Sequence, residues 1–363
     1  MKKWPLVTTL VGLIMVLAPL GCDNSESGRT AAKPDGQEIT ILFVPKLTGN
    51  AFFEAANAGA QAYAAKHGFK VEYKGHPEAD VNNQVAIIKE AIQNKVKALS
   101  ISSLDATVLD GVLKEAMAAG IKVTTWDSDV SGDARSIMVS QGTPDQLGRM
   151  LVEMGAKSLI SRGRNPTDDV IKYVWHYSQA SVTDQNSWRA AGERYIRATY
   201  PKWLNVAPEN YYSEQNAVRA VETGRAILAN HPDIDLIICN DSTALPGQAQ
   251  AAADLGLSAR DVTITGFASP RAVRDYCEAG IVERWGLWDC QVQGALACYL
   301  AWHLASGHQL SVGDRVDVPD IGLVEVMPNT VLDPEAYTSP RSGVVLLPHR
   351  TEFTADNADN YDF

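Results

Sequence analysis

Short apolar segments alternate with longer amphipathic segments in the first part of this chain. Apolar runs at 39–44, 71–73, 98–101 and 121–126 predict strands, and apolar residues at helical spacing predict helices at 52–67, 83–93 and 108–119. Gly68 and Gly120 follow two of the helical segments, in the position where glycine commonly ends a helix. Strands that alternate with helices indicate right-handed crossovers between parallel strands.

The same alternation resumes beyond residue 136. Strands are predicted at 136–139, 171–176, 235–239 and 262–267, with a further strand that ends at 285–289, and helices at 144–160, 185–199, 217–229 and 244–255. These strands are more numerous than one compact sheet usually contains. We therefore predict an α/β protein with two parallel-sheet domains and a boundary near residues 140–143.

The N-terminal residues have the pattern of a secretory signal. Lys2 and Lys3 precede an uncharged run at 4–21, and Cys22 follows it directly. A basic start, an apolar centre and a small residue before the cleavage point are typical of signal peptides. The apolar stretch at 6–20 is short for a membrane-spanning helix, which needs ~20 residues. We predict a signal peptide at 1–21.

Cys22 resembles the lipidated first residue of a mature bacterial lipoprotein. Pro19 stands where that signal usually has leucine, and Asp23 resembles the residue that retains lipoproteins at the inner membrane of Gram-negative bacteria. The segment at 22–38 is otherwise polar and has no apolar run, which is typical of a flexible tether. We predict a periplasmic protein anchored to the inner membrane by a lipid; cleavage to a soluble secreted form is the alternative.

Charge and motifs exclude several classes of protein. Lys and Arg number 32 against 43 Asp and Glu, a net charge of −11 that disfavours nucleic acid as a partner. The five cysteines form no C-x-x-C pair, and His303 and His308 are five residues apart, on different faces of a helix, so no metal site is predicted. Neither a glycine-rich phosphate loop nor a G-x-S-x-G elbow is present. We predict no cofactor, no metal and no enzymatic activity.

Polar and aromatic side chains follow the predicted strands. Ligands of open α/β sheets bind beyond the carboxyl ends of the strands. The candidates found there are Lys46, Phe52, Phe53, Asp127, Asp184, Gln185, Asn240, Ser242, Trp288 and Asp289. Carboxylates accept hydrogen bonds from hydroxyl groups, amides donate and accept, and aromatic rings cover apolar C–H faces. This set suits a small, neutral, polyhydroxylated ligand.

Each candidate also has a plainer interpretation. Asp127 and Asp184 are suited to capping the helices that follow them, Lys46 to the surface, and Phe52 or Phe53 to the core. Two aspartates facing a cleft also suit a glycosidase, but the sequence gives no reason for a raised pKa in either one. If the aspartates bind ligand, Asp127→Ala and Asp184→Ala each weaken binding by ~1.5–3 kcal/mol, and folding is expected to remain intact.

Several consecutive blocks resemble periplasmic sugar-binding proteins of ABC importers. They are PKLTGNAFFEAANAGA (45–60), TTWDSD (124–129), QGTPDQLGRML (141–151), SVTDQNSW (181–188), ALPGQAQAA (244–252), ITGFASP (264–270), WGLWDCQVQG (285–294), GVVLLP (343–348) and YDF (361–363). The resemblance implies two Rossmann-like lobes joined by a three-strand hinge. It places 39–142 and 289–326 in lobe one, and 143–288 and 327–363 in lobe two.

Within this family, the resemblance is closest to autoinducer-2-binding proteins, and rhamnose-binding proteins are near relatives. Their pocket pattern corresponds to Lys46, Asp127, Asp184 and Gln185, with Phe52, Phe53 and Trp288 as aromatic lining. Asn240 and Ser242 stand where that pattern has a proline and an alanine, which contact ligand through main-chain atoms. The resemblance implies autoinducer-2 as the ligand, and rhamnose or another monosaccharide is the alternative.

The resemblance also implies how the protein works. Ligand contacts from both lobes stabilise a closed state, which a membrane permease of the ABC type recognises. The protein is expected to be a monomer. A sugar-responsive transcription regulator shares this fold, but it needs a helix-turn-helix where residues 1–38 have a signal and a tether. A periplasmic enzyme acting on the sugar is the other competing class, and turnover of a bound ligand would support it.

Overall fold

The computed structural model describes residues 39–207 and 209–363. The predicted signal peptide at 1–21, and Cys22 with the whole of the tether at 22–38, lie outside these residues. Among the described residues, no helix combines the length and the apolar character needed to cross a membrane.

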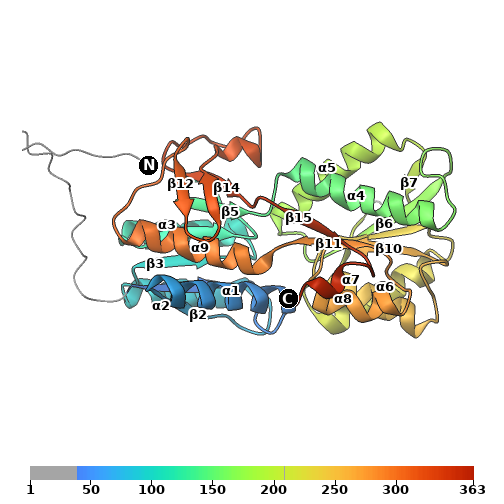
Figure 1. Ribbon diagram of the computed structural model, residues 1–363, viewed down its shortest axis with the longest axis horizontal. Helices are drawn as coiled ribbons and strands as arrows, with labels where there is room; N and C mark the ends of the chain where they lie inside the picture. The colour runs from blue at the N-terminus through green and yellow to red at the C-terminus, as the bar shows by residue number, and fades with distance from the viewer. Residues whose placement is uncertain (1–38, 208) are drawn as a thin grey trace, which may run out of the picture. The chain divides into compact units, whose positions relative to one another are not determined.

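The first lobe is built on a parallel sheet of six strands (Figure 1). Its strands are β1 (Thr40–Val44), β2 (Lys70–Tyr73), β3 (Ala98–Ile101), β4 (Lys122–Trp126), β5 (Ile137–Ser140) and β14 (Gly343–Leu346), in the order β14-β5-β4-β3-β1-β2. Its helices are α1 (Ala51–His67), α2 (Val81–Gln93), α3 (Ala106–Ala118) and α9 (Cys290–Ala305). Alternate residues of β1 separate two apolar clusters: Phe43 packs with α1 and α9, and Leu42 packs with α2 and α3.

The second lobe is built on a smaller parallel sheet. Its strands are β6 (Ile171–Tyr177), β7 (Trp203–Asn205), β8 (Tyr211–Tyr212), β9 (Leu236–Cys239) and β10 (Thr263–Gly266), in the order β10-β9-β6-β7, with β8 also paired to β6. Its helices are α4 (Pro144–Ser161), α5 (Thr183–Thr199), α6 (Ala217–Asn230), α7 (Ala244–Asp254) and α8 (Pro270–Glu278). Figure 1 shows α4 and α5 on one face of this sheet and α6 and α7 on the other.

Three segments connect the two sheets, as the fold class predicts. They are the β5–α4 connection, the connection from β11 (Trp285–Trp288) to α9, and the connection from β14 to β15 (Arg350–Phe353). Strands β11 and β15 pair antiparallel, and the remaining elements are the hairpin β12 (Arg315–Val318)–β13 (Gly322–Glu325) and the 3-10 turns η1 (Asn329–Val331) and η2 (Ala358–Asn360). The carboxyl ends of both sheets adjoin these connections, so the loops that follow the strands meet between the lobes.

The C-terminal tail divides between the lobes, unlike the prediction that 327–363 belongs to lobe two. Strand β14 pairs in parallel with β5 and completes the first sheet, and only the chain from β15 onward joins the second lobe. The physical reason is that β14 satisfies its backbone hydrogen-bonding groups by pairing with β5, from Gly343 opposite Ile137 to Leu346 opposite Ser140. The apolar run at 343–346 does not indicate which sheet edge it covers.

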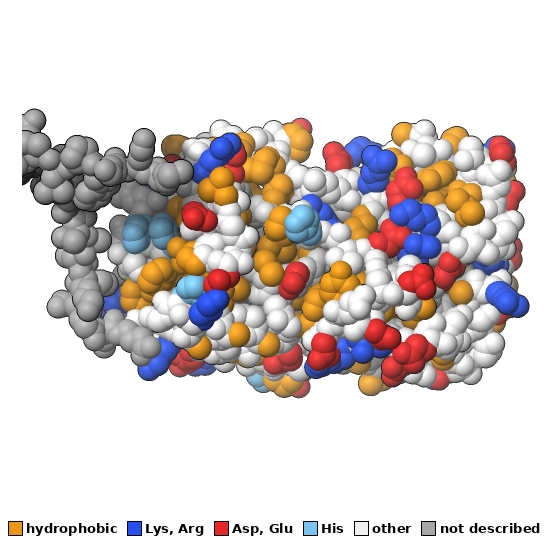
Figure 2. All heavy atoms as spheres, viewed as in Figure 1, with side chains coloured by type: hydrophobic (Ala, Val, Ile, Leu, Met, Phe, Trp, Pro, Cys, Tyr) orange, Lys and Arg blue, Asp and Glu red, His pale blue; other side chains and the backbone are white. Residues whose placement is uncertain are grey.

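Acidic and basic side chains are interspersed on the surface of the second lobe. Figure 2 shows Lys and Arg side chains beside Asp and Glu side chains around α4 and α5. Arg194 lies 2.9 Å from Asp145, and Lys157 lies 2.6 Å from Glu352. On this face, therefore, Arg194 and Lys157 are each partnered by an acidic side chain.

Candidate functional site

A tight turn after β4 presents Asp127 between the lobes. Asp127 has a φ of 60°, in the left-handed region that non-glycine residues rarely adopt. The Ser128 N–H donates to the Trp126 carbonyl at 2.7 Å, which closes a three-residue turn around Asp127. The Gln141 side-chain amide donates a hydrogen bond to the Asp127 carbonyl at 3.0 Å. A strained backbone held in this way is typical of a functional site.

The Asp127 carboxylate forms a buried ion pair with Lys46. The Lys46 ammonium lies 2.9 Å from Asp127 Oδ2, and the two side chains are 3% and 8% exposed. The Ser102 hydroxyl donates to the same oxygen at 2.7 Å. Lys46 follows β1 and Asp127 follows β4, so the carboxyl ends of two strands bring them together. Lys46 is therefore a buried residue and not the surface charge that was its plainer interpretation.

Asp184 connects the two lobes. It lies in the first turn of α5, and its Oδ2 accepts a hydrogen bond from the Asp129 N–H at 3.1 Å. Burial and the nearby charge of Asp129 raise the pKa of Asp184 to about 7, against the opposing effect of Lys46. Val182 occupies the cap position of α5 and no side chain caps this helix. Asp184 therefore bridges the lobes, which the capping interpretation did not anticipate.

The raised pKa of Asp184 predicts a pH-dependent stability. Between the ordinary pKa of 3.8 and about 7, the folded protein binds a proton at Asp184 that the unfolded chain does not. Stability from this group is therefore lost as pH rises through that range. We therefore compare the free energy of unfolding of Asp184→Asn with that of wild type at each pH. We expect this difference to be about 1–2 kcal/mol more favourable to the variant at pH 8 than at pH 5, a value reduced for partial solvent screening.

Thermal unfolding of the ligand-free proteins at pH 5 and pH 8 tests this expectation. Asp145→Asn is the control, because Asp145 also lies in the first turn of a helix but its side chain is 83% exposed. The difference in melting temperature between Asp145→Asn and wild type should be the same at both pH values. A parallel pH response of Asp184→Asn and wild type would contradict the raised pKa.

A small cavity of about 30 Å³ lies between the lobes. It is lined by Lys46, Phe52, Phe53, Asp127, Gln185, Trp188, Gln215, Asn240, Asp241, Ser242, Phe267, Leu287 and Trp288. All predicted site residues except Asp184 and Asp289 are among them. A single water needs ~10–15 Å³ by this measure, so the space holds about two. A sugar-sized molecule therefore enters only when the walls of the cavity separate.

Aromatic rings from both lobes form one wall of the cavity. Trp288 makes edge-to-face contacts with Phe52 at 5.7 Å, Trp188 at 5.9 Å and Phe267 at 5.6 Å between ring centroids. The Trp288 indole N–H donates to Gln293 at 2.6 Å, which fixes the orientation of the ring. Sequence reasoning missed Trp188 and Phe267, although Phe267 directly follows β10 and Trp188 lies one helical turn after Asp184.

Amide and carboxylate groups of the second lobe also line the cavity. Gln185 Oε1 accepts from the N–H and the hydroxyl of Ser178 at 3.1 and 2.9 Å. The Asn240 amide donates to the Gln185 carbonyl at 3.0 Å, and its Oδ1 is buried without a partner among the described residues. Sequence reasoning missed Asp241, which accepts from Ser213, Thr243 and Ala244 at the start of α7; burial raises its pKa.

Asp289 was predicted as a site residue, and the structure places it elsewhere. It is exposed, and its Oδ1 accepts from the Val292 N–H at 3.0 Å as the N-cap of α9. A carboxylate one residue before a helix finds unpaired amide groups within reach of its own side chain. The strand end at Trp288 therefore contributes an aromatic ring to the cavity, and the aspartate that follows it caps helix α9.

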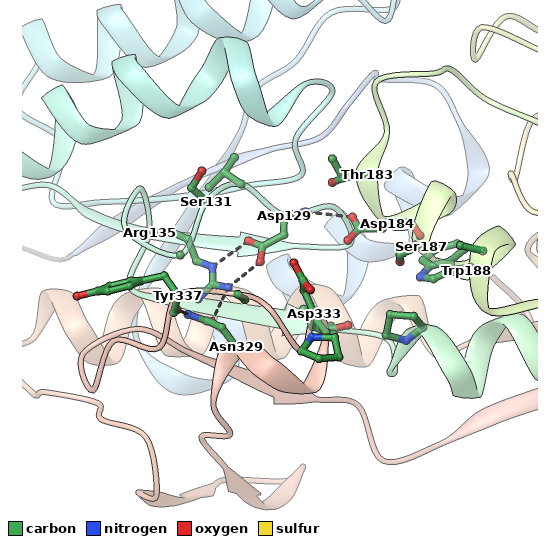
Figure 3. A pocket seen from close by; sticks show the side chains of 18 of the residues that line it. Asp129, Ser131, Arg135, Thr183, Asp184, Ser187, Trp188, Asn329, Asp333 and Tyr337 are labelled. Carbon is green, nitrogen blue, oxygen red and sulfur yellow. Dashed lines mark hydrogen bonds and ion pairs between the residues drawn. The ribbon is translucent and has the colours of Figure 1, made fainter. Parts of the chain in front are cut away.

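A larger pocket of about 750 Å³ shares Trp188 with the small cavity (Figure 3). Figure 3 shows Asp129 between Asp184 and Arg135. The Arg135 guanidinium donates to both Asp129 oxygens at 2.8 and 2.6 Å, and its side chain is 2% exposed. It also donates to Asn329, to the Ser342 hydroxyl and to the Gly343 carbonyl. Arg135 therefore ties the turn at 126–129 to the segment that contains β14.

Comparisons with known proteins agree with this fold. A family model described as "Periplasmic binding protein domain" matches residues 41–309. The structure of LsrB from Clostridium saccharobutylicum in complex with AI-2 is 59% identical, has a TM-score of 0.89 and covers 90% of this chain and 100% of that one. A solute-binding protein from Clostridium phytofermentas with bound L-rhamnose is 21% identical, with a TM-score of 0.79, and covers 90% of this chain and 98% of that one; it shows the fold alone.

Among curated proteins, the D-ribose/D-allose-binding protein of Pseudomonas aeruginosa is 27% identical over 251 residues, which is 67% of this chain and 74% of that protein. The chain belongs to the periplasmic binding protein family and has the type I fold of the sugar-binding components of ABC transporters.

Proposed function

We propose that this sugar-binding component of an ABC importer captures autoinducer-2 and delivers it to a membrane permease. The observation that carries the proposal is the Lys46–Asp127 ion pair, 2.9 Å long, on the same cavity as Gln185. Its support from relatives is the 59% identity to the LsrB that was solved with AI-2. The expected ligand is a small molecule rich in hydroxyl groups.

The charged groups of the cavity suit such a ligand. Lys46 donates to ligand oxygens, Asp127 accepts from ligand hydroxyls, and hydrogen bonds that involve a charged group are roughly twice as strong as neutral ones. Phe52 and Trp288 cover the apolar side of the ligand. A ligand that contacts both lobes binds the closed state better than the open one, so it drives closure of the hinge. The permease then receives the closed form.

The test is to identify the small molecule that the protein carries. The protein is purified from cells that make autoinducer-2 and denatured, and the released molecules are assayed with an autoinducer-2 reporter strain. Release of active signal supports the proposal. Titration calorimetry with synthetic autoinducer-2 then gives the affinity, and recovery of the ligand unchanged after incubation distinguishes binding from enzymatic turnover.

A second candidate is a binding protein for rhamnose or another monosaccharide. The observation in its favour is that Asn240 Oδ1 has no partner among the residues that the structure describes, so that together with Ser242 it offers hydrogen bonds to a further ligand hydroxyl. A ligand at ~100 times its dissociation constant stabilises the folded state by ~2.7 kcal/mol, enough for a clear thermal shift. Silence in the reporter assay, together with a thermal shift on adding L-rhamnose or a pentose, supports this candidate.

We also propose that the mature chain is a monomeric lipoprotein of the inner membrane. This rests on the sequence around Cys22 and Asp23, which lies outside the described residues. Three acyl chains, as lipoproteins carry, give stable attachment where one chain alone is marginal. We expect Cys22→Ser to move the protein from the membrane fraction to the soluble periplasm. A wild-type protein released completely by osmotic shock would argue against the anchor.

A further inference from the structure

Two successive residues before α6 have left-handed backbone conformations. Glu214 has a φ of 51° and Gln215 a φ of 53°. Neither is glycine, and non-glycine residues at positive φ are uncommon. Such strain persists only where the surrounding structure holds it, and it concentrates at ligand-binding positions.

Hydrogen bonds hold this strained pair against the carboxyl end of β6. The Glu214 N–H donates to the Ser178 carbonyl at 2.8 Å, and the Ser213 N–H donates to the Tyr177 carbonyl at 2.8 Å. The Gln215 N–H donates to the Ser213 hydroxyl at 3.1 Å, and this hydroxyl donates in turn to Asp241 at 2.9 Å. The strand end and the start of α7 thus fix the position of Gln215.

The two strained residues have different surroundings. Glu214 is exposed and lies 3.0 Å from Arg219 at the surface. Gln215 is 6% exposed and lines the cavity between the lobes. Among the described residues, the side-chain amide of Gln215 has no hydrogen-bond partner, although its backbone N–H has one. The strained turn therefore places at the cavity a largely buried residue whose side-chain amide has no partner among the described residues.

Asn240 provides a second unused group on the same cavity. Its side chain is 1% exposed, its amide nitrogen donates to the Gln185 carbonyl, and its Oδ1 has no partner among the described residues. A buried acceptor without a donor is costly, so a ligand that supplies an O–H group is favoured there. An ether or carbonyl oxygen supplies no such donor.

We propose that Gln215 is a ligand-contacting residue that determines specificity, and that with Asn240 it recognises a hydroxyl group on the side of the ligand facing the second lobe. This rests on the proposed function, that the cavity takes a small polyhydroxylated ligand, and it adds a contact separate from Lys46 and Asp127. A hydroxyl satisfies both residues, because it donates to Asn240 Oδ1 and accepts from the Gln215 amide.

The test uses glycine at each strained position. Glycine adopts positive φ without steric cost, so Gln215→Gly and Glu214→Gly both keep the turn and relieve its strain. We expect both variants to melt at or above the wild-type temperature. Only Gln215→Gly removes a side chain from the cavity, and Glu214→Gly is its matched control, one residue away on the exposed side.

Binding is measured by titration calorimetry with synthetic autoinducer-2, L-rhamnose, D-ribose and D-arabinose. We expect Gln215→Gly to lower the affinity for the ligand that wild type binds most tightly by about tenfold, which corresponds to the loss of about one hydrogen bond. We also expect it to change the affinity ratios among the four molecules. Glu214→Gly should bind all of them as wild type does.

The outcomes separate this inference from the proposed function. If wild type binds a sugar and not autoinducer-2, the autoinducer-2 assignment fails, and the effect of Gln215→Gly is measured with that sugar. If Gln215→Gly binds the wild-type ligand with unchanged affinity and unchanged ratios, the inference fails and the proposed function stands. If wild type binds none of the four molecules, both are overturned.

Discussion

Replacing Asp127 by alanine is expected to abolish ligand binding and to lower the free energy of unfolding by about 3–5 kcal/mol. The substitution leaves the Lys46 ammonium, 3% exposed, without the carboxylate that lies 2.9 Å away. It also removes the acceptor of the Ser102 hydroxyl. An unpaired buried charge strongly destabilises the folded state, so we expect the substitution to lower stability as well as binding.

This expectation differs from the one based on the sequence alone. Asp127 was expected to face a wet cleft, so that its removal would leave folding intact. The structure instead buries the carboxylate beside Lys46, where both line a cavity with room for about two waters. The ion pair therefore contributes to the stability of the fold as well as to ligand binding.

Urea unfolding of wild type, Asp127→Ala and Asp133→Ala measures the effect. Asp133 is the matched control, because it lies 2.9 Å from Lys114 in an ion pair whose side chains are 45% and 58% exposed. Asp133→Ala should lower the free energy of unfolding by less than 1 kcal/mol. The double variant Lys46→Met/Asp127→Leu should recover much of the stability but none of the binding. If Asp127→Ala is as stable as Asp133→Ala, Lys46 is solvated and the argument is wrong.

Replacing Arg135 by leucine is expected to destabilise the protein by a similar amount, about 3–5 kcal/mol. The guanidinium is buried and donates to both oxygens of Asp129. Without it, the Asp129 carboxylate lies unpaired beside Asp184, whose own pKa already reflects repulsion from Asp129. The turn at 126–129 also loses its connection to Asn329, so we expect ligand binding to fall even where the protein remains folded.

Arg194→Leu is the control for this prediction. Arg194 also forms an ion pair with an aspartate, Asp145, at 2.9 Å, but the two side chains are 58% and 83% exposed. The control should change the free energy of unfolding by less than 1 kcal/mol and leave the affinity unchanged. Equal stability of the Arg135 and Arg194 variants would mean that the Arg135 network contributes little to the fold.

Local patterns in the sequence determine the elements and much of the candidate site. Helical and strand periodicities depend on neighbouring residues, so the predicted strand at 98–101 coincides with β3 and the predicted helix at 144–160 with all but the last residue of α4. The rule that ligands bind where parallel strands end points to Lys46 and Asp127 from their positions in the chain. The structure places both of these side chains on one cavity.

Tertiary structure decides the features that depend on partners far away in the chain. Strand β14 lies about two hundred residues from β5, and its local sequence does not indicate which edge it covers. Asp289 has the same residue type as Asp127 and also follows a strand, yet a helix N-terminus takes up its carboxylate. Gln215 reaches the cavity through a backbone conformation that no sequence period predicts.

The reason for this division is physical. Hydrophobic periodicity and capping are set within a few residues, so they can be read along the chain. The charge state, burial and partners of a side chain depend on which atoms the whole fold places within a few ångströms. The sequence by itself therefore determined the α/β elements and the strand ends that carry Lys46 and Asp127. Only the tertiary structure decided that these two residues form a buried ion pair. It also decided that, from the other lobe, Asp184 bonds to Asp129 and Gln215 lines the same cavity.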